Sequence, residues 1–285
     1  EEIMAAGQKM YRELSPETAE FFDFMMENQL FDVLGRKTKK AGGYMTYLPL
    51  YHAPFIFANF NGTSGDVDVI THECGHAFQG YLAAQDPIRE HADIGMETAE
   101  IHSMSMEFLT SPYHSLFFKE QTPKYELSHA EDALSFIPYG TMVDHFQEIV
   151  YSNPDMTPAQ RNETWANLEK QYRPYIDFDN LPFYGRGAGW QRQLHIYLNP
   201  FYYIDYCLAQ TVALEFWAMI RKDLKNAWQH YMAYTVQGGS KTFTDLLKNA
   251  ELESPFDEKC LRGVCAEAAE ALDASFYFVN QKQLY

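Results

Sequence analysis

Two histidines stand four positions apart, and a glutamate directly follows the first, in the run His72-Glu73-Cys74-Gly75-His76. Residues at i and i+4 share one face of an α-helix, so both imidazoles can bind a single Zn²⁺ while the glutamate reaches a nearby water molecule. Apolar residues flank the run at helical spacing, and Gly75 leaves room for a second element to approach closely. The run therefore predicts a buried helix with a metal site. The alternative is a pair of histidines satisfied by packing or solvent beside a salt-bridging glutamate.

Apolar residues recur at helical spacing along most of the 285 residues. Ser15-Pro16-Glu17 has the residue types of a helix start, which predicts a helix over about 16–30, and the residues before it also follow a helical pattern. After Asn61-Gly62 the pattern predicts helices near 66–84, 93–110, 124–151, 158–172, 188–198, 201–222, 225–236 and 257–279. We expect a mainly α protein.

The stretch from Gly42 to Asn61 has a different texture, rich in Tyr, Phe, Ile and Thr and interrupted by Pro49 and Pro54. This texture predicts short strands at about 43–48 and 54–60. The breaks between the predicted helices are too short for flexible linkers, and the sequence has no internal repeat. We therefore expect residues 1–285 to form one helical domain with a small β-sheet near its front.

The charge balance, the lack of long apolar stretches and the cysteines limit which partners the protein can bind and in which cell compartment it can work. The chain has 22 Lys and Arg against 39 Asp and Glu, a formal net charge of −17, which repels a phosphate backbone and argues against nucleic acid. No apolar stretch approaches the length of a spanning helix, and the start lacks the features of a signal peptide, so we expect no membrane partner. Four irregularly spaced cysteines do not make a disulfide framework. We expect a cytoplasmic protein.

A catalytic zinc needs a third protein ligand and an open fourth position. The acid-rich helix that starts near Met96 offers Glu97, Glu100 and Glu107, which can share one face. The residues alone do not choose among Glu97, Glu100 and His102 as the third ligand. A solvated helix face is the alternative explanation for each acid.

Two runs, Asp68–Ala77 and Ala53–Gly62, resemble the catalytic region of the M3 family of zinc oligopeptidases and are most similar to its oligoendopeptidase F members. In that family the third ligand begins a segment of the form E-x-x-S-x-x-x-E, which Glu100–Glu107 matches. The resemblance implies a zincin-like helical fold with a small β-sheet beside the motif helix. It also implies one Zn²⁺ per chain, held by His72, His76 and Glu100, with Glu107 close behind these ligands. His102 stands where smaller residues are commoner in the family and remains an outside candidate.

The second half of the chain carries another match. Gly185–Trp190, then His195, then Phe201–Tyr206 resemble the family's mobile Gly-rich loop and a following cluster of His and Tyr that faces the zinc. Peptide hydrolysis builds an oxyanion, and Tyr O–H and His N–H groups are donors to it. The resemblance implies this role for His195 with Tyr203 or Tyr206, while Tyr202 and Tyr197 are weaker candidates. Aromatic core packing is the alternative for each tyrosine.

The resemblance covers nearly all of this chain but only the catalytic half of the family's length. In the family an N-terminal helical region forms the facing wall of a channel that admits short peptides. We therefore expect this chain to be the C-terminal part of a longer protein, and the alternative is a compact relative with a more open cleft. An extended peptide can add to a sheet edge through main-chain hydrogen bonds. Gly42, Gly43 and Tyr44 and the strand at 55–60 are candidates for that edge, with Tyr202 as a further substrate contact. Ordinary sheet packing explains the same residues equally well.

The expected function is zinc-assisted hydrolysis of internal bonds in short peptides, in which Glu73 takes a proton from water and passes it to the leaving amine. Two alternatives stay open. A zinc carboxypeptidase of helical H-E-x-x-H type would need a cation for the substrate's terminal carboxylate, and Arg186 or Arg192 could supply it. A non-catalytic zinc-containing domain that binds peptides would have no need of Glu73 as a base.

Overall fold

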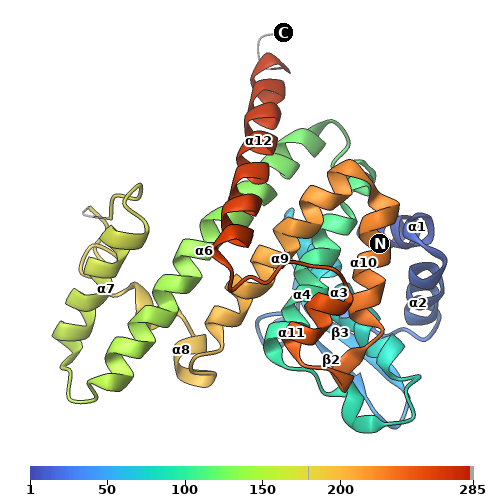
Figure 1. Ribbon diagram of the computed structural model, residues 1–285, viewed down its shortest axis with the longest axis horizontal. Coiled ribbons are helices and arrows are strands. Elements are labelled where there is room, and N and C mark those ends of the chain that lie inside the picture. The colour runs from blue at the N-terminus through green and yellow to red at the C-terminus, as the bar shows by residue number, and fades with distance from the viewer. Residues whose placement is uncertain (179, 283–285) are drawn as a thin grey trace. The chain divides into compact units, whose positions relative to one another are not determined.

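A computed structural model describes residues 1–178 and 180–282, which fold into two compact units (Figure 1). The first unit comprises Glu1–Ala130 and the chain from Ala209 onward, and the second comprises Glu131–Leu208. Two long helices, α6 (Thr122–Ser152) and α9 (Tyr203–Lys222), each contribute residues to both units. The assignment of both units to one catalytic domain stays a prediction from the sequence.

The first unit opens with two helices, α1 (Glu2–Leu14) and α2 (Pro16–Glu27). The Ser15 side chain accepts a hydrogen bond from the backbone N–H of Thr18 at 3.1 Å, and Pro16 occupies the first turn of α2. This cap satisfies one of the backbone donors that a helix start leaves unpaired. The predicted helix start is therefore confirmed, although α2 ends earlier than the expected residue 30.

A three-stranded sheet follows in the described part of the chain, in the order β1-β3-β2. Strand β1 (Phe31–Leu34) runs parallel to β3 (Ala53–Phe60), and β2 (Tyr44–Leu48) runs antiparallel to β3. The strands β2 and β3 confirm the prediction, whereas β1 was missed because four residues are too few to show a pattern. Since β3 is paired on both sides, the expectation that residues 55–60 offer a free edge is wrong.

Helix α3 (Gly65–Ala83) contacts β2, β3 and α4 (Met96–Leu109). Asp66 fixes the turn from β3 into α3, because its carboxylate accepts hydrogen bonds from the backbone N–H groups of Asn61 and Gly62 at 2.9 and 2.8 Å. A Cβ atom at Gly75 would lie 2.4 Å from the His102 carbonyl oxygen and 2.6 Å from the Ser103 Cα atom. Only glycine permits this approach of α3 to α4, so the close packing expected at Gly75 is confirmed, with α4 as the partner.

The remaining helices of the first unit are α5 (Ser115–Phe118), α10 (Leu224–Thr235), α11 (Phe243–Asn249) and α12 (Glu258–Lys282). The sequence pattern predicted α10 and α12 close to these bounds and missed the shorter α5 and α11. Across residues 1–178 and 180–282, no helix has the combination of length and apolar character that spanning a bilayer requires.

The second unit is built from the later part of α6, from α7 (Pro158–Tyr172) and α8 (His195–Leu198), and from the start of α9. The prediction of one helix over 188–198 is wrong, because only Gly189–Arg192 forms a 3₁₀ turn before the four-residue α8. Gly187 has φ +72°, and a Cβ atom there would lie 2.0 Å from the Asn162 carbonyl oxygen on α7. Gly187 therefore packs closely against α7, and the extended backbone of Gln193, with φ −82° and ψ 91°, separates the 3₁₀ turn from α8. The core of the unit contains Met142, Val143, Phe146, Trp165, Leu168, Trp190, Ile196 and Tyr203.

Candidate active site

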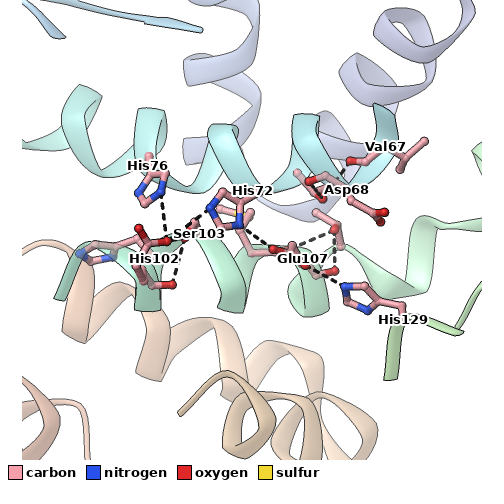
Figure 2. Close-up of polar contacts among 12 residues, drawn as sticks. Val67, Asp68, His72, His76, His102, Ser103, Glu107 and His129 are labelled. Carbon is pink, nitrogen blue, oxygen red and sulfur yellow. Dashed lines mark hydrogen bonds and ion pairs between the residues drawn. The ribbon is translucent and has the colours of Figure 1, made fainter. Parts of the chain in front are cut away.

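Three side chains converge between α3 and α4 in the first unit. The Nε2 atoms of His72 and His76 lie 3.4 and 3.5 Å from Oε2 of Glu100. One ligand atom from each of the three residues lies within 4.8 Å of the others. Figure 2 shows both histidines projecting from one helix toward the neighbouring helix that carries Ser103 and Glu107. The structure therefore brings together the three residues predicted as metal ligands.

The Glu100 carboxylate is held in place from its own helix. Its side chain is buried, and the Ser103 hydroxyl donates a hydrogen bond to Oε2 at 3.1 Å. Burial raises the pKa of Glu100, but the hydrogen bonds from His72 and His76 outweigh this effect and hold the pKa well below its usual range. A buried, ionised carboxylate facing two imidazoles is a donor set that suits a divalent metal.

Glu73 lies beside this group and has an unsatisfied oxygen. Its side chain is buried, and Oε2 has no hydrogen-bond partner among the described residues. Burial raises the pKa of the Glu73 carboxyl, while His72 and His76 offset part of the rise. A Cβ atom at Gly43 would lie 3.6 Å from Oε1 of Glu73, so this carboxylate sits next to the segment that leads into β2. A buried carboxylate with a raised pKa and a free oxygen is suited to accept a proton.

Glu107 connects the histidine motif to a residue that the sequence did not reveal. Its Oε1 lies 2.7 Å from Nδ1 of His72, and its Oε2 lies 2.8 Å from Nε2 of His129 on α6 (Figure 2). Burial raises the pKa of Glu107, but the hydrogen bonds from His129 and His72 outweigh it and lower the pKa to about 2. The structure places Glu107 in contact with His72, one of the three residues predicted as ligands. His129 was missed because no local motif surrounds it.

The two other candidates for the third ligand lie elsewhere. His102 is buried on another face of α4, where its Nδ1 lies 3.2 Å from the Thr235 hydroxyl and its ring packs against Tyr231 and Tyr234. Burial lowers the pKa of His102 to about 3. The Glu97 carboxylate lies against Gly95 at the start of α4. It is so close that a Cβ atom at Gly95 would lie 2.3 Å from its Oε1. Neither residue belongs to the converging group, so His102 is a core histidine.

A second cluster of predicted residues lies within the second unit. The His195 ring is surrounded by the rings of Tyr203, Tyr206 and Tyr202, with centroids 4.9, 5.7 and 6.1 Å away. Burial is the main cause that raises the pKa of the Tyr203 hydroxyl, which therefore stays protonated as a donor. Tyr197 is not part of this cluster, because it is 52% exposed and stacks on Trp190 instead.

The predicted substrate edge and the Gly-rich segment also have definite places. β2 is an edge strand of the described sheet, and Gly42, with φ +97°, and Gly43 precede its first residue, Tyr44. The Tyr44 ring is half exposed and stacks on Phe57 at 4.9 Å. In the Gly-rich segment, residues 187–190 are buried against α7, and the Trp190 indole N–H donates to Asn162 at 2.9 Å.

Comparison with known proteins identifies the group to which this site belongs. The model of Peptidase family M3 matches residues 17–265, which is most of the chain. The chain belongs to peptidase family M3. The M3 relatives include an oligoendopeptidase F homolog of Borreliella burgdorferi, 28% identical over 220 residues, which are 70% of this chain and 36% of the relative. Oligopeptidase PepF of Bacillus subtilis is 24% identical over 281 residues, which are 94% of this chain and 40% of the relative.

The M3 fold is matched by solved structures as well. PZ peptidase A with an inhibitor aligns with a TM-score of 0.93 and 50% identity, over 96% of this chain and 49% of that chain. The predicted fold, mainly α with a small sheet beside the motif helix, is thereby confirmed. The matched part of this chain covers less than half the length of each of these three M3 proteins.

Proposed function

We propose that this M3-family chain is the zinc-dependent catalytic part of a metalloendopeptidase that hydrolyses internal bonds of short peptides. One observation carries the proposal: His72, His76 and Glu100 converge directly beside Glu73, whose Oε2 is buried and has no hydrogen-bond partner among the described residues. Three ligands with an adjacent unpaired carboxylate are what a catalytic zinc site requires and what a structural site, with its four protein ligands, does not.

The donor set fits one Zn²⁺ per chain. A tetrahedral zinc with ligand bonds of about 2.0–2.1 Å separates its ligand atoms by roughly 3.3–3.5 Å. The distances of 3.4 and 3.5 Å from Glu100 to the two histidines agree with this spacing. When bound, zinc supplies Lewis-acid chemistry that activates water and polarises a peptide carbonyl.

The residues around the proposed ligands transfer the proton, orient a ligand and stabilise the oxyanion. Glu73 accepts a proton at Oε2 from the attacking water and returns it to the leaving amine, a role that its raised pKa favours. Glu107 holds the His72 ring through Nδ1, which directs Nε2 toward Glu100. His195 with Tyr203 or Tyr206 donates hydrogen bonds to the oxyanion that forms at the scissile carbonyl.

We assign substrate binding to main-chain hydrogen bonds between an extended peptide and the edge strand β2. Gly42, Gly43 and Tyr44 lead into the edge strand β2, and an extended peptide that pairs there gains affinity without a sequence requirement. Tyr202 is proposed as a further contact. The names of the M3 relatives, an oligoendopeptidase F homolog and an oligopeptidase, support short peptides as the substrate class. The four irregularly spaced cysteines of the sequence do not make a disulfide framework, which supports a cytoplasmic, reducing location.

The proposal is tested by measuring bound zinc and the cleavage of a peptide blocked at both ends. We expect one zinc per chain and cleavage at an internal bond, both abolished by a strong chelator and restored by added zinc. Cleavage of unblocked peptides only, one residue at a time from the C-terminus, would instead identify a carboxypeptidase. Stoichiometric zinc without any hydrolysis would identify a non-catalytic domain.

A further inference from the structure

A cavity of about 490 Å³ lies within the second unit and has no role in the proposed chemistry. This volume falls in the range of roughly 300–1,000 Å³ that is usual for small-ligand sites. Two arginines, Arg173 and Arg192, line the cavity, against one carboxylate, Glu169. A cavity with an excess of positive charge stands out in a chain whose formal net charge is −17.

Arg173 is largely buried between two aromatic rings, and its guanidinium group has donors to spare. Its side chain is only 17% exposed, and its guanidinium group lies over the rings of Tyr139 at 4.9 Å and Phe178 at 5.4 Å. Its Nε lies 3.5 Å from Oε2 of Glu169, but the guanidinium group makes no hydrogen bond within residues 1–178 and 180–282. A stacked, planar guanidinium with unused donors matches the two oxygens of a carboxylate.

The other polar groups of the cavity complete such a site. Arg192 is exposed, lies over the Tyr184 ring at 5.9 Å and donates a hydrogen bond to the Tyr184 hydroxyl. Glu169 is 8% exposed and is bound through Oε1 by the Trp165 indole N–H at 3.1 Å. Its single charge offsets one arginine, so a bound monoanion balances the second. Arg186, which the sequence also suggested for a carboxylate, does not line this cavity and lies over Phe183 instead.

The cavity is connected to His195 inside the same unit. The Tyr139 hydroxyl donates to Oε1 of Gln193 at 2.8 Å, and Nε2 of Gln193 lies 2.7 Å from Nδ1 of His195. Tyr203 lines the cavity and also packs its ring against His195. A group bound in the cavity is therefore adjacent to the residues assigned to the oxyanion.

We propose that this cavity binds a carboxylate of the peptide substrate through Arg173 and Arg192. The inference rests on the proposed function for the identity of the ligand as a peptide. The carboxylate is either the free C-terminus or an acidic side chain, and both present the same two oxygens. An extended peptide advances about 3.3 Å per residue, so a carboxylate held here fixes which bond of a short peptide reaches His195.

Binding to the full chain that carries Glu73→Gln tests the inference without turnover. Fluorescent peptides are compared in two arms: a free against an amidated C-terminus, and an internal Glu against Gln in amidated peptides. The variants Arg173→Met and Arg192→Met each remove one guanidinium. Arg186→Met is the matched control, since it removes an exposed arginine of the same unit outside the cavity.

We expect the carboxylate form to bind about tenfold or more tightly in one arm, since hydrogen bonds between charged groups have roughly this effect. The preference should be lost in Arg173→Met and Arg192→Met and kept in Arg186→Met. The arm in which it occurs identifies the source of the carboxylate. Because Arg192 is exposed, its variant remains informative if Arg173→Met fails to fold.

Equal binding of both forms in both arms would overturn the inference, and so would a preference that survives both cavity variants. The proposed function fails separately. A carboxylate preference that depends on both arginines, combined with no hydrolysis by the unsubstituted zinc-loaded chain, contradicts the peptidase but leaves the carboxylate site in place.

Discussion

The Glu107 carboxylate accepts a hydrogen bond from Nδ1 of His72 at 2.7 Å. The protonation states of the two groups determine which one donates. Because hydrogen bonds lower the pKa of Glu107 to about 2, the group is ionised at neutral pH and can only accept. His72 must then carry a proton on Nδ1, so Nε2, which faces Glu100, is the nitrogen that would bind a metal. The Glu107 carboxylate thus determines which nitrogen of His72, a proposed ligand, faces the metal site.

Glu107→Ala is expected to weaken zinc binding by about 10–100-fold, because partners that orient a ligand histidine have effects of this size. Chelator competition measures the dissociation constant directly. Glu107→Gln keeps a hydrogen-bond acceptor for His72 and should lose less. Equal affinity of Glu107→Ala and the unsubstituted chain would show that the ring is oriented by packing alone.

Glu100→Ala is expected to lose zinc far more readily than Glu97→Ala. Glu100 is buried between the two histidines, whereas the Glu97 carboxylate lies against Gly95. Zinc content after dialysis against a weak chelator compares the two variants under one condition. If Glu97→Ala lost its zinc and Glu100→Ala kept it, the assignment of the third ligand would be reversed.

Gly75→Ala is expected to destabilise the fold by about 1–3 kcal/mol, since the new Cβ atom would collide with the α4 backbone and not with a flexible side chain. Gly263 in α12 is the matched control, because a Cβ atom there meets nothing within 4 Å. Gly263→Ala should stabilise its helix by about 0.5–1 kcal/mol. Urea unfolding of both variants measures the difference, and equal stability of the two would contradict the close approach of α3 to α4.

Removing the hydroxyl of the tyrosine that acts on the oxyanion should lower kcat about 10²–10³-fold while zinc content stays unchanged. Tyr203→Phe and Tyr206→Phe test this separately, since each keeps its ring and therefore its packing against His195. Tyr197→Phe is the control, because that exposed side chain lies outside the cluster. If both cluster variants kept kcat within about twofold while His195→Ala lost its zinc, His195 would be a metal ligand and both tyrosines core residues.

Sequence reasoning succeeded where local patterns determine structure. The helical spacing located α3, α4, α6, α7, α9, α10 and α12, and the H-E-x-x-H run located the helix face on which His72 and His76 meet Glu100. Spacing did not choose among Glu97, Glu100 and His102, since that choice depends on which face of α4 packs against Gly75. The family resemblance indicated Glu100.

Contacts between distant segments were beyond prediction from the residues. His129 follows Glu107 by 22 positions and reaches it only because α6 packs beside α4. The break within 188–198 occurs at the extended backbone of Gln193. The cavity at Arg173 is lined by residues of α6, of α7 and of the segment that follows α7, such as Tyr139 and Arg192. None of these contacts produces a periodic pattern of residues that the sequence would show.

The most direct test of the account is the Glu73→Gln variant, assayed for bound zinc and for peptide hydrolysis in the same preparation. The substitution preserves the shape of the side chain and removes the proton acceptor at Oε2, so zinc should stay at one per chain while kcat falls about 10²–10⁴-fold. Glu97→Gln, an equivalent change outside the converging group, should retain both. Near-normal turnover in Glu73→Gln with full zinc would contradict the role of Glu73 as the base and, with it, the proposed mechanism.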